Sequence, residues 1–274
     1  MMPCPCSRTH RPLRYCGVLA MVAIAIGTLS GMVDEDAVTR NAARVEALEQ
    51  AMPVGPRSAE KLGLRVAWRQ PIDANAITEM LISNGAVFLI DSDNEIAMLD
   101  LESGQQRWVG FGGSGNDLIV DIQHIPADQK VLVIRASSIL SLSAKTGIPI
   151  VYGATQSSMQ PLEWLAATPG VVYNDSYIYG GLAGEVVWQG WAMGFSLRAH
   201  RIGRRVASQP IVTGHVVLAS SQSGELVALD AETGTLLWQR RLLDTISGVP
   251  ATSSTMTFVA SRDQHLRAFD TANG

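Results

Sequence analysis

The sequence predicts an all-β fold, a β-propeller of about five four-stranded blades, preceded by an N-terminal hydrophobic segment and a short helix. Three observations predict it. Glycines recur at intervals of roughly 40–50 residues, a period typical of propellers and solenoids. An aspartate often stands four residues before such a glycine and a tryptophan four residues after it. Short apolar runs separated by turn residues fill each interval. The recurring glycines are Gly104, Gly147, Gly194, Gly234 and Gly274.

One repeat contains four short segments with the composition of β-strands. They are residues 77–83, 86–90, 96–99 and 105–109, and Gly, Asn and Asp residues stand between them. A helical repeat of similar length is the alternative, but these runs are too short and too rich in β-branched residues for helices. Four strands and three turns in about 42 residues correspond to one propeller blade.

The repeated residues resemble a known family, the pyrroloquinoline-quinone-like (PQQ-like) propeller repeat. Its signature is Ala-x-Asp-x-x-x-Gly-x-x-x-Trp, and the resemblance implies that the tryptophan docks between neighbouring blades. Residues 228–238 match the signature completely, and two further copies match it in part. The second and third copies keep only their glycine. The repeat-structural residues are Trp68, Asp100, Gly104, Trp108, Gly147, Gly194, Asp230, Gly234, Trp238, Asp270 and Gly274.

The last repeat stops at its turn glycine and has no tryptophan strand of its own. A segment with the composition of such a strand, residues 64–70 around Trp68, stands before the first repeat and resembles residues 236–240. We expect this segment to complete the last blade, which would remove an open sheet edge. The alternative is a propeller that is incomplete at its C-terminus.

The N-terminal region predicts export across a membrane. Residues 15–33 are uncharged and mostly apolar, three arginines precede them, and Asp34, Glu35 and Asp36 follow. This asymmetry places the N-terminus in the cytoplasm and the propeller on the far side. Because the apolar run lies between the lengths of a secretory signal and a full span, residues 1–33 are either a cleaved signal peptide or a membrane anchor.

Residues 34–60 predict a helical spacer and linker, and residues 61–274 the propeller. We expect the periplasmic side of a bacterial cell envelope, with the protein tethered to the inner membrane or exported. All three cysteines, Cys4, Cys6 and Cys16, lie before or at the start of the apolar run. The propeller therefore contains no disulfide, and no cysteine follows the run as a lipoprotein anchor requires.

Composition and motifs give no sign of catalysis, metal or cofactor. The net charge of −4 argues against nucleic acid as a partner. The five histidines are scattered without ligand spacing. Residues 110–115 contain Gly-x-Gly-x-x-Gly, but neither a helix nor a phosphate-binding Lys-Ser/Thr follows. We expect no enzyme and no bound cofactor. A quinone-dependent dehydrogenase and a ligand- or glycan-binding propeller are the alternatives.

Aromatic and basic residues gather in and around the third repeat, beyond what the repeat pattern requires. Packing between blades explains most buried tryptophans, and contact with another protein is the alternative, since large aromatics and arginines anchor interfaces. The decay of the repeat signature makes this sector the candidate interaction site. Its residues are Trp164, Trp188, Trp191, Arg198, Arg201, Arg204 and Arg205.

Within the repeat family, the chain most resembles the propeller subunit of the bacterial outer-membrane barrel-assembly machinery. The resemblance implies a non-catalytic scaffold that binds other envelope proteins through its loops. We expect contact with the membrane through residues 15–33 and no metal.

Overall fold

A computed structural model describes residues 42–43, 46–47, 50, 55–65, 67–72, 75–114, 117–151, 157–191, 196–246 and 248–274. The chain divides into two compact units, Met1–Val66 and Ala67–Gly274. In the first unit, helix α2 (Pro56–Lys61) begins after Gly55, with proline at its first position, where a missing N–H costs nothing. No helix within the described ranges is long and apolar enough to span a membrane. The apolar run 15–33 lies outside the described residues.

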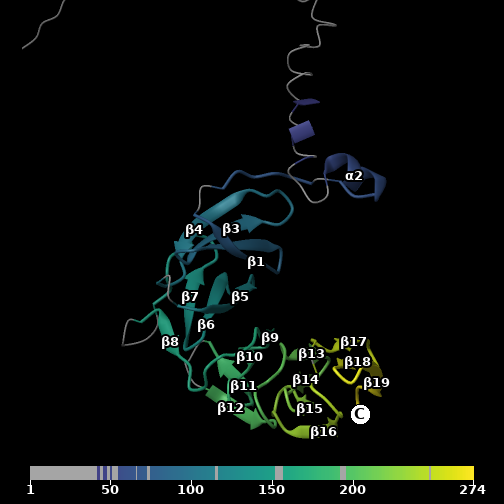
Figure 1. Ribbon diagram of the computed structural model, residues 1–274. Coiled ribbons are helices and arrows are strands. Elements are labelled where there is room, and N and C mark those ends of the chain that lie inside the picture. The colour runs from purple at the N-terminus through teal and green to yellow at the C-terminus, as the bar shows by residue number, and fades with distance from the viewer. Residues whose placement is uncertain are drawn as a thin grey trace, which may run out of the picture. The chain divides into compact units, whose positions relative to one another are not determined.

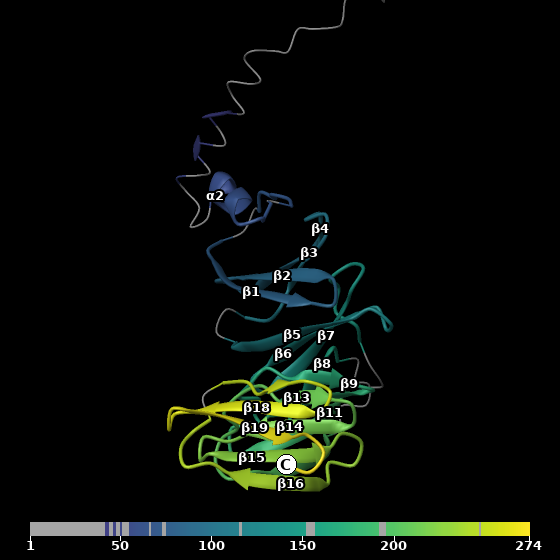
Figure 2. The same cartoon turned by 90° about the vertical axis from the view of Figure 1, so that its right-hand side faces the viewer.

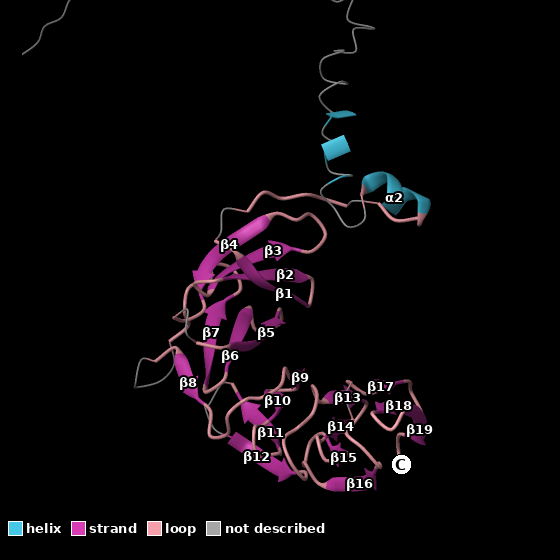
Figure 3. Ribbon diagram, viewed as in Figure 1, coloured by secondary structure: helices cyan, strands magenta, loops and turns pink. Residues whose placement is uncertain are grey.

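The second unit consists of five antiparallel sheets that follow one another in chain order (Figure 1, Figure 2). Four sheets have four strands and the last has three, and each strand pairs with its neighbour in sequence (Figure 3). The prediction of an all-β propeller built from four-stranded blades is confirmed.

The strands of the first two sheets are β1 (Ile77–Ser83), β2 (Ala86–Asp91), β3 (Glu95–Asp100), β4 (Gln106–Phe111), β5 (Ile119–Ile125), β6 (Lys130–Arg135), β7 (Ser138–Ser143) and β8 (Met159–Pro161). Those of the third and fourth are β9 (Val171–Tyr173), β10 (Ser176–Gly180), β11 (Glu185–Gly190), β12 (Ser196–Arg201), β13 (Ile211–Thr213), β14 (Val216–Ser220), β15 (Glu225–Asp230) and β16 (Leu236–Arg241). The last sheet contains β17 (Ala251–Thr252), β18 (Met256–Ser261) and β19 (His265–Asp270).

The second and third strands of the first four sheets form the core because both of their faces are covered, by a neighbouring sheet or, in the first sheet, by Trp68 and Ile72 on one side. Every residue of β2 is buried, and so is every residue of β14. Such strands have near-continuous apolar sequences instead of alternating ones. The outer strands are mostly exposed: in β4 and β16 the tryptophan is the one buried residue. The burial pattern thus explains why only the tryptophan recurs on these strands.

The aspartate and glycine of the repeat build the turn between the third and fourth strands. Asp100 Oδ1 accepts hydrogen bonds from the backbone N–H groups of Glu102 and Ser103, at 3.2 and 2.9 Å. Gly104 closes the turn with a φ of +69°, a conformation that glycine adopts without strain. The Ser103 backbone bond and the Arg107 guanidinium hold the pKa of Asp100 well below its ordinary value.

The expected completion of the last blade by residues 64–70 is wrong. The sheet β17–β19 has three strands, and no strand forms in the described part of residues 64–70. Trp68 packs instead with Ile72 against β2 and β3 of the first sheet, and its Nε1 donates to Leu101 O at 2.9 Å. The likeness of residues 64–70 to an outer strand indicated a tryptophan that docks on a sheet. It did not indicate which sheet edge the segment joins.

Candidate interaction surface

Each junction between consecutive sheets contains one side-chain N–H group that donates to the carbonyl just after a third strand. Three of these donors are indoles at 2.9 Å from their carbonyls: Trp108 Nε1 to Ala144 O, Trp188 Nε1 to Ala231 O and Trp238 Nε1 to Thr271 O. Each indole also lies close to the turn glycine of the next sheet: Gly147, Gly234 or Gly274. A Cβ atom on Gly147 would lie 2.6 Å from the Trp108 ring, so this position requires glycine.

Trp188 fills the junction between the third and fourth sheets from the third strand of its sheet, whereas the other junction tryptophans lie on a fourth strand. We call this the exchange of the tryptophan. Trp188 on β11 pairs with Arg198 on β12, whereas Ala228 on β15 pairs with Trp238 on β16. The third strand therefore supplies the indole, and Arg198 takes the place of the outer-strand tryptophan. Because Trp188 is only 1% exposed, the prediction that it contacts a partner is wrong. The equal spacing of the two pairs could have revealed the exchange.

Trp191 is also an internal residue. It is 2% exposed and packs in the core between the second and third sheets. Its carbonyl accepts a hydrogen bond from Gln160 Nε2, so a glutamine takes the part that an indole plays elsewhere. The prediction that Trp191 contacts a partner is wrong, and Gln160 is a junction residue that no sequence pattern indicated. Gly194, the recurring glycine of this repeat, lies outside the described residues.

Of the remaining candidates, Arg198 and Arg201 lie on β12, whereas Trp164, Arg204 and Arg205 lie on loops. Three loops are adjacent at the end of the sheets where a fourth strand leads into the next blade. Residues 162–170 contact the turn 181–184 through the bond from Leu182 N to Leu165 O at 3.1 Å. That turn contacts residues 202–210 through Ile202 N and Gly184 O at 2.7 Å. The loops thus form one continuous surface on top of the third sheet.

We name this region the loop surface and define it by its outward side chains. Leu165 and Leu182 are 48% and 49% exposed, although both are large and apolar. Tyr179 Oη donates to Trp164 O at 2.8 Å, and burial raises the pKa of this phenol, so it stays protonated as a donor. The loop surface consists of half-buried Trp164 and exposed Leu165, Leu182, Arg201, Arg204 and Arg205.

The arginines of the loop surface keep most of their binding capacity. Within the described ranges, the side chains of Arg201 and Arg204 make no hydrogen bond or ion pair. Arg205 Nη2 makes a single long bond to Ala167 O, at 3.4 Å. Guanidinium groups in this state can bind carboxylates bidentately. Arg198 does not belong to the surface, because it is half-buried and its Cδ would lie 2.9 Å from a Cβ on Gly234.

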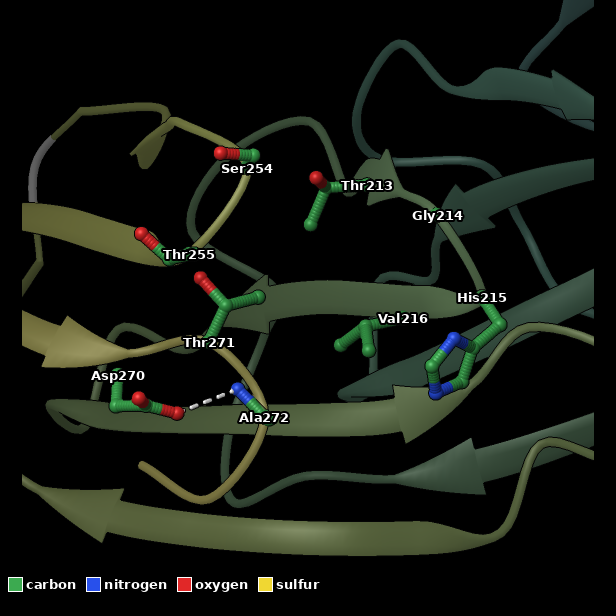
Figure 4. A pocket seen from close by; sticks show the side chains of 9 residues that line it. All are labelled: Thr213, Gly214, His215, Val216, Ser254, Thr255, Asp270, Thr271 and Ala272. Atoms are coloured by element: carbon green, nitrogen blue, oxygen red, sulfur yellow. Dashed lines mark hydrogen bonds between the residues drawn. The ribbon is translucent and has the colours of Figure 1, made fainter.

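A hollow of about 480 Å³ lies at the opposite ends of the strands, between the fourth and fifth sheets (Figure 4). Its lining is rich in hydroxyl groups, with one imidazole and one carboxylate. The carboxylate of Asp270 already accepts the Ala272 N–H at 2.9 Å. No three His, Cys, Asp or Glu side chains in the described part of the chain could hold a metal ion together. The lining residues include Thr213, His215, Ser254, Thr255, Asp270 and Thr271.

Antiparallel four-stranded sheets joined by docked tryptophans define the class of protein as a β-propeller of the PQQ-like repeat type. The chain belongs to the family described as outer membrane protein assembly factor BamB, whose model matches residues 64–161 and 174–274. Both matched parts contain well-kept copies of the repeat, and the gap between them falls in the decayed sector.

Curated relatives share part of the chain. The outer membrane protein assembly factor BamB of Salmonella typhimurium strain LT2 is 32% identical over 111 residues, which are 40% of this chain and 26% of that protein. The protein of the same name from Escherichia coli K12 matches to the same extent. The alignment to these relatives spans about a quarter of their length.

Solved structures share the fold. BamB from Moraxella catarrhalis has a TM-score of 0.57 at 21% identity, covering 77% of this chain and 63% of that one. The computationally designed Ika8 protein has a TM-score of 0.55 at 17% identity, covering 72% and 59%. The WD40 domain of Neurospora crassa Pan2 has a TM-score of 0.53 at 11% identity, covering 73% and 64%. At these identities the likeness concerns the propeller fold alone.

Proposed function

We propose that the chain is a non-catalytic propeller scaffold that binds other proteins of the bacterial envelope during the assembly of outer-membrane proteins. The assembly role comes from the family and from the names of the relatives. The observation that carries the binding role is the loop surface, which contains exposed leucines and exposed arginines. Arg201 and Arg204 make no side-chain hydrogen bond among the described residues, and Arg205 makes one long bond.

The composition of the loop surface is that of a protein contact site. Large apolar side chains contribute binding energy when a partner removes them from water, and arginine adds charge-assisted hydrogen bonds. The backbone hydrogen bonds between the loops hold the loop backbone in place, so binding has to order the side chains and not the loops. A partner segment with an apolar side chain flanked by carboxylates fits this surface.

The location belongs to the same proposal. Residues 15–33 either anchor the protein in the inner membrane or are removed as a signal peptide, with the propeller in the periplasm. Three arginines before the apolar run and three acidic residues after it support this orientation. No position is assigned to a catalytic group, and the binding proposal requires none.

The test is capture of envelope partners by the full-length chain in its native membrane, with photo-crosslinking and mass spectrometry. Arg204→Glu together with Arg205→Glu should abolish capture of the crosslinked partner, because carboxylates then face its acidic groups. Arg262→Glu is the matched control, an exposed arginine in a turn of the last sheet. Equal capture by the double variant and the control would refute the loop surface as the contact site.

A further inference from the structure

The junction between the second and third sheets has polar side chains where its neighbours have aliphatic ones. Tyr177 and Tyr179 of β10 stack at 5.7 Å between ring centroids. Their counterparts on β14 in the next sheet are Val217 and Ala219. Tyr177 Oη donates to Asp121 Oδ2 at 2.8 Å, so even the deepest phenol of this junction has a polar partner.

Three buried oxygen atoms at this junction lack a hydrogen-bond partner among the residues that the structure describes. They are Ser141 Oγ on β7, Gln160 Oε1 on β8 and Gln189 Oε1 on β11. Ser141 and Gln189 have no exposed surface, and Gln160 is 7% exposed. Buried polar atoms in folded proteins are nearly always hydrogen-bonded, to protein or to ordered water.

Strand register places these three side chains on the two faces that meet. Ser141 pairs with Leu132, and Gln160 pairs with Ile139; both apolar partners belong to the core between the second and third sheets. Paired residues of an antiparallel sheet point to the same face. Gln189 pairs with Tyr177 of the same core, so it faces the second sheet from the other side.

The polar side chain of Ser141 is also smaller than the side chains at the same position of two other sheets. Ser141 stands at the position that Met98 occupies in the first sheet and Trp188 in the third. The outer strand β8 supplies Gln160 instead of an indole, and this glutamine uses its N–H group on Trp191 O. Its Oε1 therefore remains in the junction as an acceptor.

We propose that ordered water binds between the second and third sheets and donates hydrogen bonds to Ser141, Gln160 and Gln189. A water molecule donates at most two hydrogen bonds, so two molecules supply the donors that three acceptors from two facing sheets require. Buried water in proteins typically makes about three hydrogen bonds, donated and accepted together. At the other junctions, where an indole lies over a turn glycine, the described residues include no comparable set of unpaired acceptors. The second junction is therefore the hydrated one of the series.

The test is radiolytic hydroxyl-radical labelling of the full-length chain, with mass spectrometry of the modified aromatic residues. Water held beside a buried ring yields radicals within reach of that ring. Trp191 is 2% exposed and Trp108 is 7% exposed, so labelling by bulk solvent alone would modify Trp108 faster. We expect Trp191 to be labelled several-fold faster than Trp108.

A double variant tests whether labelling of Trp191 depends on the oxygen atoms of Ser141, Gln160 and Gln189. Ser141→Ala with Gln189→Leu removes two acceptors, and labelling of Trp191 should fall below that of Trp108 while Trp108 is unchanged. Labelling of Trp191 slower than Trp108 in the natural chain would overturn the proposal. So would fast labelling that persists in the folded double variant. Should the variant not fold, the comparison within the natural chain decides by itself.

Discussion

Trp108 joins two sheets through the apolar surface that its ring buries and through one hydrogen bond. Its indole is buried over the Gly147 turn, and its N–H donates to Ala144 O. Truncation would leave a cavity and an unpaired carbonyl, so Trp108→Ala should lower the free energy of unfolding by about 3–5 kcal/mol. Urea unfolding followed by circular dichroism measures the change.

Trp164→Ala is the comparison, since this tryptophan is half-buried in a loop and makes no indole bond in the described structure. We expect it to cost much less than Trp108→Ala. Equal losses for the two variants would contradict the docking role of Trp108.

The turn aspartates predict acid sensitivity. Backbone N–H bonds, first those to Ser103 and Thr233, lower the pKa of Asp100 and of Asp230 in the folded protein. A lowered folded-state pKa gives stability that is present above the unfolded value of 3.8 and is lost as pH falls through the folded value. The thermal midpoint of the natural chain should therefore fall between about pH 4 and pH 2.

Asp100→Asn with Asp230→Asn keeps the shape of both turns and removes both titrations. Thermal scans across the same pH range should show a shallower fall in this double variant, with a lower midpoint at neutral pH. Parallel curves for the two proteins would show that other groups control acid unfolding.

At the scale of the element, β11 and β12 exchange the tryptophan between them. Trp188→Ala should destabilise the chain as strongly as Trp108→Ala, because the indole caps Ala231 O. Adding Arg198→Trp recreates the Ala228 and Trp238 arrangement of the next sheet. The second substitution should restore most of the loss.

A double-mutant cycle with urea unfolding measures this coupling. Arg198→Trp alone should destabilise, since two indoles then compete for the space beside Gly234. Simple additivity of the two single losses would refute the exchange.

At the scale of the whole molecule, the charge pattern around residues 15–33 predicts a cytoplasmic N-terminus. In intact cells, Cys4 and Cys6 should resist an impermeant thiol reagent. A cysteine introduced by Ser254→Cys, at an exposed position of the propeller, should react once the outer membrane is made permeable. Labelling of the natural cysteines in cells with an intact inner membrane would overturn this orientation, and the N-terminal sequence of the mature protein shows whether the segment is cleaved.

The blades could be predicted from the sequence because their information is local. A strand of β2 or β14 is recognisable from its own apolar run, and Asp100 with Gly104 specifies a turn within five residues of chain. The loop arginines 201, 204 and 205 were also predictable as exposed, since charged side chains seldom lie in a core without a partner. Leu165 and Leu182 carried no such signal, because an apolar residue in the sequence is normally buried.

The sequence by itself determined the repeat, the all-β class and the turn that each aspartate and glycine build, since these depend on neighbours along the chain. Only the tertiary structure decided which tryptophans are internal and which sheet Trp68 joins. It also decided that Gln160 takes the part of an indole and that Leu165 and Leu182 are exposed. These properties arise where one sheet meets the next, between residues some 30 to 40 positions apart in a repeat of that length. Burial there depends on the facing sheet, which local sequence does not encode.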